Sequence, residues 1–149
     1  MQKYFPTGVH DPLMLLRRYI LVSIAGGVLF LFLDALLNAN PLATGLYTVF
    51  QPVARSEINV PAGILIDLAY GFILAALFLL LYQSLPGTSG IGKGINFAFM
   101  LWFLRVVMTV LSQWMMFVVP VPLFLYLLGA GLFAMLVLGV LYGATLRPE

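Results

Sequence analysis

Residues 61–83, PAGILIDLAYGFILAALFLLLYQ, decide the fold of this chain. They form a continuous apolar run that contains one charged side chain, Asp67, and no alternation of polar and apolar positions. A helix rises about 1.5 Å per residue, so about 20 residues cross the roughly 30 Å hydrocarbon layer of a bilayer. A helix also satisfies its backbone hydrogen bonds within one segment, as lipid requires. Residues 61–83 are therefore predicted to be a transmembrane helix.

Three further apolar runs of similar length, residues 19–38, 95–118 and 122–146, predict three more spans. The composition agrees, because 63% of the 149 residues are hydrophobic and only 8% are charged, which excludes a soluble domain with a hydrated surface. We therefore expect an all-α integral membrane protein, a four-transmembrane-helix bundle that forms a single domain over residues 1–149.

The beginning of the first helix has its own signals. Asp11 and Pro12 are typical of a helix cap and first turn, so the helix is predicted to begin ahead of Arg17 and Arg18. A basic pair before an apolar run also occurs in cleaved signal peptides, but this run is longer than their apolar core and three spans follow it. We expect a retained span.

Basic residues in the connections predict the orientation, since short cytoplasmic segments are enriched in Lys and Arg. An even number of spans places both chain ends on one side, and most basic residues fall there, whereas Arg55 falls on the other side. The expected location is a bacterial or archaeal cytoplasmic membrane, with both termini in the cytoplasm. The basic residues on the predicted cytoplasmic side are Lys3, Arg17, Arg18, Lys93 and Arg147.

The segment 39–60 is the one long connection and is predicted to be external. Its apolar residues recur at helical spacing, which favours an interfacial helix lying on the membrane, but Pro52 would interrupt such a helix, which favours an ordered loop packed over the bundle. Both interpretations remain open. The residues at helical spacing are Leu42, Leu46, Val49, Phe50 and Val53.

Three charged residues lie inside predicted spans: Asp34, Asp67 and Arg105. Each costs at least roughly 2.5 to 3.5 kcal/mol at the bilayer centre, so such side chains usually face protein or water. We expect Asp67 to contact Arg105, directly or through water. The predicted intramembrane polar site, drawn from three helix faces, consists of Asp34, Asp67, Tyr70, Arg105, Thr109, Ser112 and Gln113. Two interpretations apply: hydrogen-bonded packing seams, or a small hydrated cavity open to the outside.

Gly139 and Gly143 form a GxxxG pattern in the fourth span. Small residues at this spacing let another helix backbone approach closely. The partner is either a helix of the same chain or a helix of another molecule.

Catalytic and cofactor motifs are not found in the sequence. The chain has no cysteine and one histidine, His10, and Ser112 has no histidine to activate it. The glycine-rich residues 90–94, GIGKG, lack the spacing and the Ser or Thr of a P-loop. We expect no catalytic residue, cofactor or metal site.

Two functions of different kinds follow from these patterns. The first is a non-catalytic accessory or structural membrane protein that binds lipids, partner helices or a second copy of itself. The alternative is a small-solute or proton channel or transporter, with a polar cavity lined by Asp34, Asp67 and Arg105. Nucleic acid is not an expected partner.

Overall fold

The computed structural model describes residues 12–146, and within that range the chain is helical and contains no strand. Four helices are long and apolar enough to span a membrane, which confirms the prediction of four apolar helices: Leu13–Asn38, Val60–Leu81, Gly90–Met116 and Val121–Thr145. Lys3, His10, Asp11 and Arg147, which entered the predictions above, lie outside the described residues.

The elements follow one another along the chain with short connections, except between the first and second spans. In order they are α1 (Pro12–Asn38), α2 (Pro41–Leu46), the 3-10 helix η1 (Tyr47–Val53), α3 (Val60–Leu81), α4 (Gly90–Leu101), the π-helix η2 (Trp102–Val107), α5 (Met108–Met116) and α6 (Val121–Thr145). The third span is thus α4, η2 and α5 in one continuous helix.

The helix ends follow from local sequence. The side chain of Asn59 accepts a hydrogen bond from the Ala62 backbone N–H (3.1 Å), which caps α3. The third span begins at Gly90, earlier than the predicted residue 95, because the hydroxyl of Ser89 accepts a hydrogen bond from the Gly92 backbone N–H (3.0 Å). Such caps satisfy backbone donors that the first turn of a helix leaves free.

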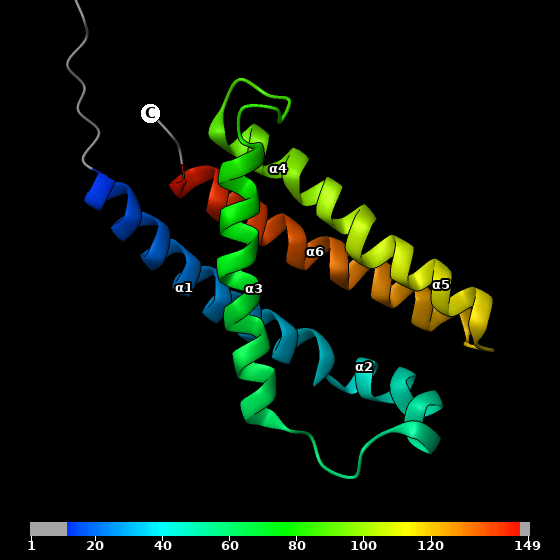
Figure 1. Ribbon diagram of the computed structural model, residues 1–149. Coiled ribbons are helices and arrows are strands. Elements are labelled where there is room, and N and C mark those ends of the chain that lie inside the picture. Colours follow the sequence, from blue (N-terminus) through cyan, green and yellow to red (C-terminus); the bar gives the residue numbers. More distant parts are fainter. Residues whose placement is uncertain (1–11, 147–149) are drawn as a thin grey trace, which may run out of the picture.

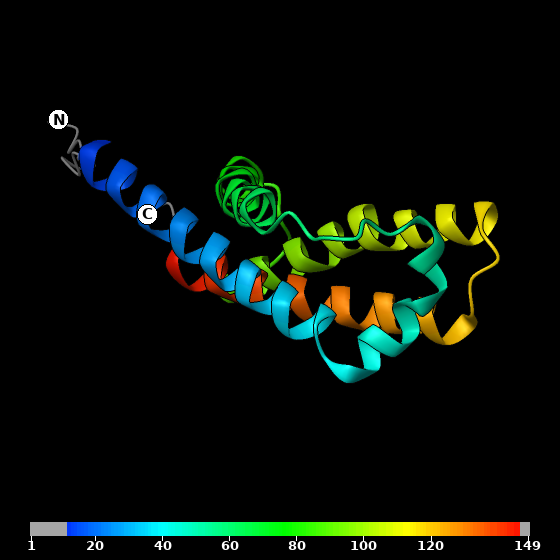
Figure 2. The same cartoon turned by 90° about the horizontal axis from the view of Figure 1, so that it is seen from below.

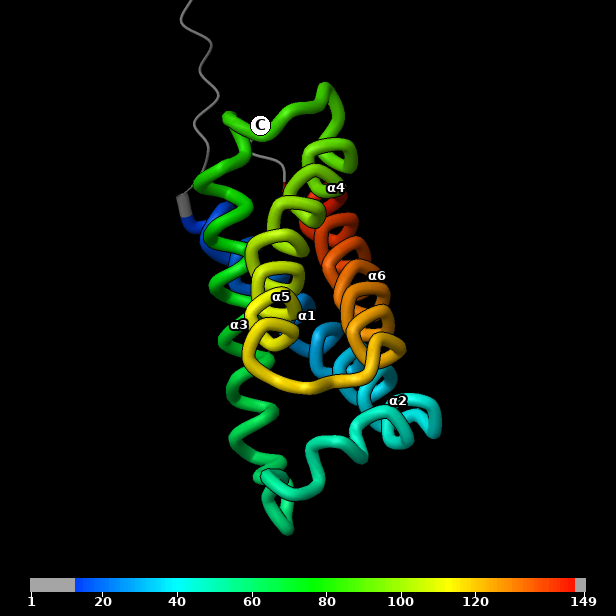
Figure 3. Tube along the Cα trace, turned by 90° about the vertical axis from the view of Figure 1, so that its right-hand side faces the viewer, coloured from blue at the N-terminus to red at the C-terminus, as the bar shows by residue number. Residues whose placement is uncertain are grey.

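The four spans form two pairs, as Figures 1 to 3 show. α1 packs along α3, α4 packs along α6, and the pairs meet mainly between α1 and α6. α3 crosses the other helices at a steep angle and moves away from α5 (Figures 1 and 2). We call the end with the α3–α4 connection the turn end and the end with α2 and η1 the loop end. α1 begins and α6 ends at the turn end (Figure 1).

Glycines set the closest helix contacts in each pair. In α3, a Cβ atom added to Gly71 would collide with the Ser23 carbonyl and the backbone of Gly27 in α1. In α6, a Cβ atom added to Gly139 would collide with the Gly94 carbonyl of α4. Only a residue without a side chain allows the backbones to approach this closely.

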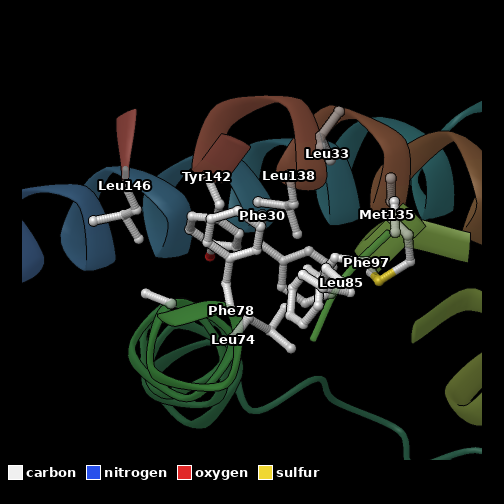
Figure 4. Packing of buried hydrophobic residues seen from close by; sticks show 13 residues of the cluster. Phe30, Leu33, Leu74, Phe78, Leu85, Phe97, Met135, Leu138, Tyr142 and Leu146 are labelled. Carbon is white, nitrogen blue, oxygen red and sulfur yellow. The ribbon is translucent and has the colours of Figure 1, made fainter. Parts of the chain in front are cut away.

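The buried apolar core forms where side chains from α1, α3, α4 and α6 converge (Figure 4), and its aromatic cluster lies in the turn-end half. The ring of Phe78 lies 5.2 Å from that of Phe97 and 6.2 Å from that of Tyr142, measured between ring centres. All three side chains are fully buried. The Tyr142 hydroxyl donates a hydrogen bond to the Gly71 carbonyl (3.3 Å), which ties α6 to α3.

The segment between α1 and α3 is partly helical. It forms two short helices, α2 and η1, and Pro52 lies inside η1. Asn40 Nδ2 donates a hydrogen bond to the Tyr126 hydroxyl of α6 (2.7 Å), and this hydroxyl donates to the Leu37 carbonyl. The start of the segment is therefore anchored to the helices.

Candidate binding cavity

A cavity of about 430 Å³ lies in the loop-end half of the molecule. α1, η2, α5 and α6 form most of its wall, α3 contributes Tyr70, and η1 contributes Tyr47. Its polar lining residues are Asp34, Asn38, Tyr47, Tyr70, Arg105, Thr109 and Gln113. Its apolar lining residues are Phe30, Leu37, Val106, Val110, Leu127, Ala130, Gly131, Ala134 and Met135. The cavity therefore combines apolar walls with several convergent polar groups, as ligand sites usually do.

Arg105 supplies the positive charge of the cavity. Its guanidinium carbon lies 4.3 Å from the ring centre of Tyr70 and 4.9 Å from that of Phe30. The two rings meet edge to face, with centres 5.5 Å apart. Across residues 12–146 the guanidinium has no hydrogen-bond acceptor and no carboxylate within 4.0 Å. The rings thus stabilise the charge by cation–π attraction but leave its N–H donors unsatisfied.

The backbone around Arg105 is a π-helix, η2, inside an otherwise α-helical span. It is held from α6, because Trp102 Nε1 donates a hydrogen bond to the Leu128 carbonyl (2.9 Å) and the Val106 methyls pack against Gly131. Thr109 Oγ1 donates to the Arg105 carbonyl (2.6 Å). Single π-helical turns within α-helices are rare and frequently mark functional sites.

Asp34 supplies the negative charge and is held by a short chain of hydrogen bonds. Asn38 Nδ2 donates to Asp34 Oδ1 (2.9 Å), and the Tyr47 hydroxyl donates to Asn38 Oδ1 (2.6 Å). Burial raises the pKa of the Tyr47 phenol, with smaller contributions from Tyr126 and Asp34, so the hydroxyl stays protonated and keeps donating. Within the described chain, Asp34 Oδ2 accepts no hydrogen bond.

Gln113 adds a second unsatisfied acceptor. Its Oε1 atom is buried and has no hydrogen-bond partner among residues 12–146. Because this atom is buried, a ligand in the cavity does not reach it without a movement of the Gln113 side chain. The cavity itself presents free donors on Arg105 and a free acceptor on Asp34.

The structure brings together most of the polar site predicted from the sequence. Asp34, Tyr70, Arg105, Thr109 and Gln113 line the cavity. Ser112 does not, because its side chain is exposed elsewhere on α5 and its hydroxyl donates to the Met108 carbonyl (2.9 Å).

Asp67 also lies outside the cavity lining. Its side chain is 8% exposed and lies where α3 packs on α1. Of the contact predicted with Arg105, direct or through water, the direct form is not made, since no ion pair within 4.0 Å joins the two residues and the Arg105 guanidinium lies over aromatic rings.

Gly139 and Gly143 pack inside the chain. Gly139 lies against Gly94 and Ala98, and Gly143 lies against Gly90 and Ile91 of α4. The close approach predicted by the GxxxG pattern is therefore used between α6 and α4 of the same molecule.

Phe30, Asn38 and Tyr47 are among the lining residues that the site predicted from the sequence did not include. Asn38 stands four residues after Asp34 in α1, so the helical repeat was a usable signal. Phe30 carries no signal that distinguishes it from a core or lipid-facing residue. Tyr47 comes from η1, which only the fold brings to the end of the cavity.

Within residues 12–146, no group of three or more His, Cys, Asp or Glu side chains is placed to hold a metal ion. Comparisons with protein-family models, curated protein sequences and solved structures find no match to this chain.

Proposed function

We propose that this protein binds a small polar ligand within the membrane, in the cavity beside Arg105. The observation that carries the proposal is the guanidinium of Arg105, which faces a cavity of about 430 Å³ with its N–H donors unsatisfied. A volume of this size lies within the roughly 300 to 1,000 Å³ typical of ligand pockets.

The free-energy cost of placing Arg105 within the bilayer supports a role for this residue beyond packing. An arginine near the bilayer centre is unfavourable by several kcal/mol, and such residues typically mark ligand or ion sites. A packing seam would pair its polar groups with each other, yet the Arg105 donors beside the cavity have no partner among residues 12–146. Binding a ligand with acceptor atoms there would satisfy them.

Solute passage is the less favoured use of the same cavity. A channel needs a continuous path to the turn end, where the buried rings of Phe78, Phe97 and Tyr142 fill the space between the helices. We therefore propose a binding role in preference to an open pore.

An accessory role is the second candidate, and the position of α3 favours it. α3 packs chiefly along α1, and Leu65, Ile73 and Leu80 on its surface are exposed. A partner helix beside α3 would bury these side chains. Purification in mild detergent would then recover a defined partner, whereas a solitary monomer that retains a small ligand would favour the binding role.

The location and orientation belong to the same proposal. Arg17 and Arg18 near the start of α1 and Lys93 in α4 support a turn end that faces the cytoplasm, while Arg55 is the basic residue between η1 and α3. The cavity would then lie in the outer half of a bacterial or archaeal cytoplasmic membrane.

Cysteine labelling tests the cavity directly, because the natural chain has no cysteine. Thr109→Cys places a thiol in the lining, and Met108→Cys places one at nearly the same depth outside it. In vesicles, a water-soluble methanethiosulfonate should modify Thr109→Cys at least about tenfold faster, because thiolates form in water and not in lipid. Equal, slow modification of both variants would contradict a water-accessible cavity.

A further inference from the structure

We propose that the cavity recognises a zwitterion, with an anionic oxygen group bound by Arg105 and a primary ammonium bound by Asp34. This inference rests on the proposed function and specifies its ligand chemistry. A phosphatidylethanolamine headgroup and a free amino acid share this chemistry.

The anionic end follows from how Arg105 is held. Its guanidinium carbon lies 4.3 Å from the ring centre of Tyr70 and 4.9 Å from that of Phe30, and its N–H donors have no acceptor among residues 12–146. A guanidinium carries paired N–H donors whose spacing matches two oxygens of a carboxylate or phosphate. The ring contacts also restrict the side chain in advance, which lowers the entropy lost on binding.

The ammonium end follows from the free acceptor. Asp34 keeps Oδ2 unbonded, while Asn38, itself held by the Tyr47 hydroxyl, donates to Oδ1. A primary ammonium has three N–H donors and can serve this acceptor. A quaternary ammonium has none and would leave it unsatisfied.

Charge complementarity disfavours the simpler ligands. The cavity lining contains one guanidinium, Arg105, and one carboxylate, Asp34. A purely anionic ligand would leave Asp34 without a donor, and a purely cationic one would leave Arg105 without an acceptor. A zwitterion is the class that satisfies both ends.

The first experiment compares three lipids on the whole protein. Nanodiscs contain equal amounts of phosphatidylethanolamine, phosphatidylcholine and phosphatidylglycerol, and native mass spectrometry measures which lipid stays bound. We expect phosphatidylethanolamine to be retained about tenfold more than either other lipid, the effect of one lost charged hydrogen bond. Phosphatidylcholine is the matched control, since it differs only in its methylated ammonium.

Variants of the protein identify which residue binds each end of the ligand. Asp34→Asn should remove the preference for phosphatidylethanolamine over phosphatidylcholine, and Arg105→Met should lower retention of both by about tenfold. Ser112→Ala, outside the cavity, should change neither. Thermal unfolding of each variant identifies any that fail to fold. Asn38→Ala then replaces that variant, because it removes the amide that positions Asp34 without removing a charge.

Soluble ligands distinguish the two sources of the chemistry. Glycine and phosphoethanolamine are titrated into the protein in phosphatidylcholine nanodiscs and binding is followed by calorimetry. If phosphatidylethanolamine is retained and neither solute binds, the natural ligand is a lipid. If a solute binds and phosphatidylethanolamine is not retained, the natural ligand is a free solute. Both outcomes support the proposal. Equal retention of phosphatidylglycerol, or no binding in any arm, would overturn it.

Failure of this inference is separable from failure of the proposed function. If phosphatidylglycerol is retained and Arg105→Met releases it, the cavity binds a ligand but not a zwitterion. If Thr109→Cys and Met108→Cys are also modified equally, the binding role itself falls.

Discussion

The guanidinium carbon of Arg105 lies 4.3 Å from the ring centre of Tyr70, although the two residues belong to different helix pairs. Tyr70 is carried by α3, which packs on α1, and Arg105 is carried by the span that packs on α6. In the loop-end half, this contact bridges the two pairs across the cavity. The contact between Arg105 and Tyr70 therefore closes the cavity and orients its positive charge.

Replacing Tyr70 by Leu should weaken ligand retention more than stability. The change removes a cation–π contact worth about 0.5 to 2 kcal/mol and frees the guanidinium plane, so retention should fall by a factor of about 2 to 30. Native mass spectrometry measures it. Tyr70→Phe keeps the ring and should behave almost like the natural protein; equal losses in both variants would show that the hydroxyl, and not the ring, matters.

Replacing Gly139 by Ala should destabilise the protein. The new methyl would lie within 2.8 Å of Ala98 Cβ and collide with the Gly94 carbonyl, which forces α4 and α6 apart. We expect a loss of about 1 to 3 kcal/mol in the free energy of unfolding, measured by titration with SDS in mixed micelles. Gly129→Ala is the matched control in the same helix, since a Cβ there meets nothing within 4 Å, and it should be neutral or slightly stabilising.

Deleting Leu104 should distinguish the role of the π-helix in ligand retention from its effect on the stability of the fold. A π-helical turn accommodates one additional residue, so removal of this exposed residue should restore a continuous α-helix while α4 and α5 keep their packing faces. Thermal stability should therefore be kept while Arg105 loses its position and ligand retention falls. Unchanged retention in the folded deletion variant would contradict a role for η2 in placing Arg105.

Labelling from opposite sides should determine the orientation. Thr48→Cys lies in η1 at the loop end and Thr88→Cys lies in the α3–α4 connection at the turn end, and both positions are exposed. A membrane-impermeant maleimide added to intact cells should label Thr48→Cys, and Thr88→Cys should be labelled only after the membrane is opened. The opposite pattern would place the cavity in the cytoplasmic half.

The spans could be predicted from the sequence because the bilayer fixes their length and excludes charge. Residues 61–83 were predicted and α3 covers Val60–Leu81, and the fourth span agrees as closely. The polar site was also visible in part, since Arg105, Thr109 and Gln113 recur on one helix face. These features depend on local periodicity, which a sequence records.

The rest depends on tertiary packing. The π-helix has no sequence signal, and both Thr109 and Ser112 fit a polar stripe although only Thr109 lines the cavity. Asp67 and Arg105 were paired on expected depth, but the steep crossing of α3 leaves Asp67 beside α1. Tyr47 reaches the cavity only because the connection after α1 folds back over the helices.

The crossing of α1 and α3 has a mechanical consequence for the cavity. The backbones touch at Gly27 and Gly71, and Tyr70, the α3 residue in the cavity lining, is the neighbour of Gly71 in the chain. A side chain at Gly71 would therefore push α3 away from α1 and carry the Tyr70 ring away from Arg105. The missing side chain of one glycine thus sets the width of the cavity at this wall.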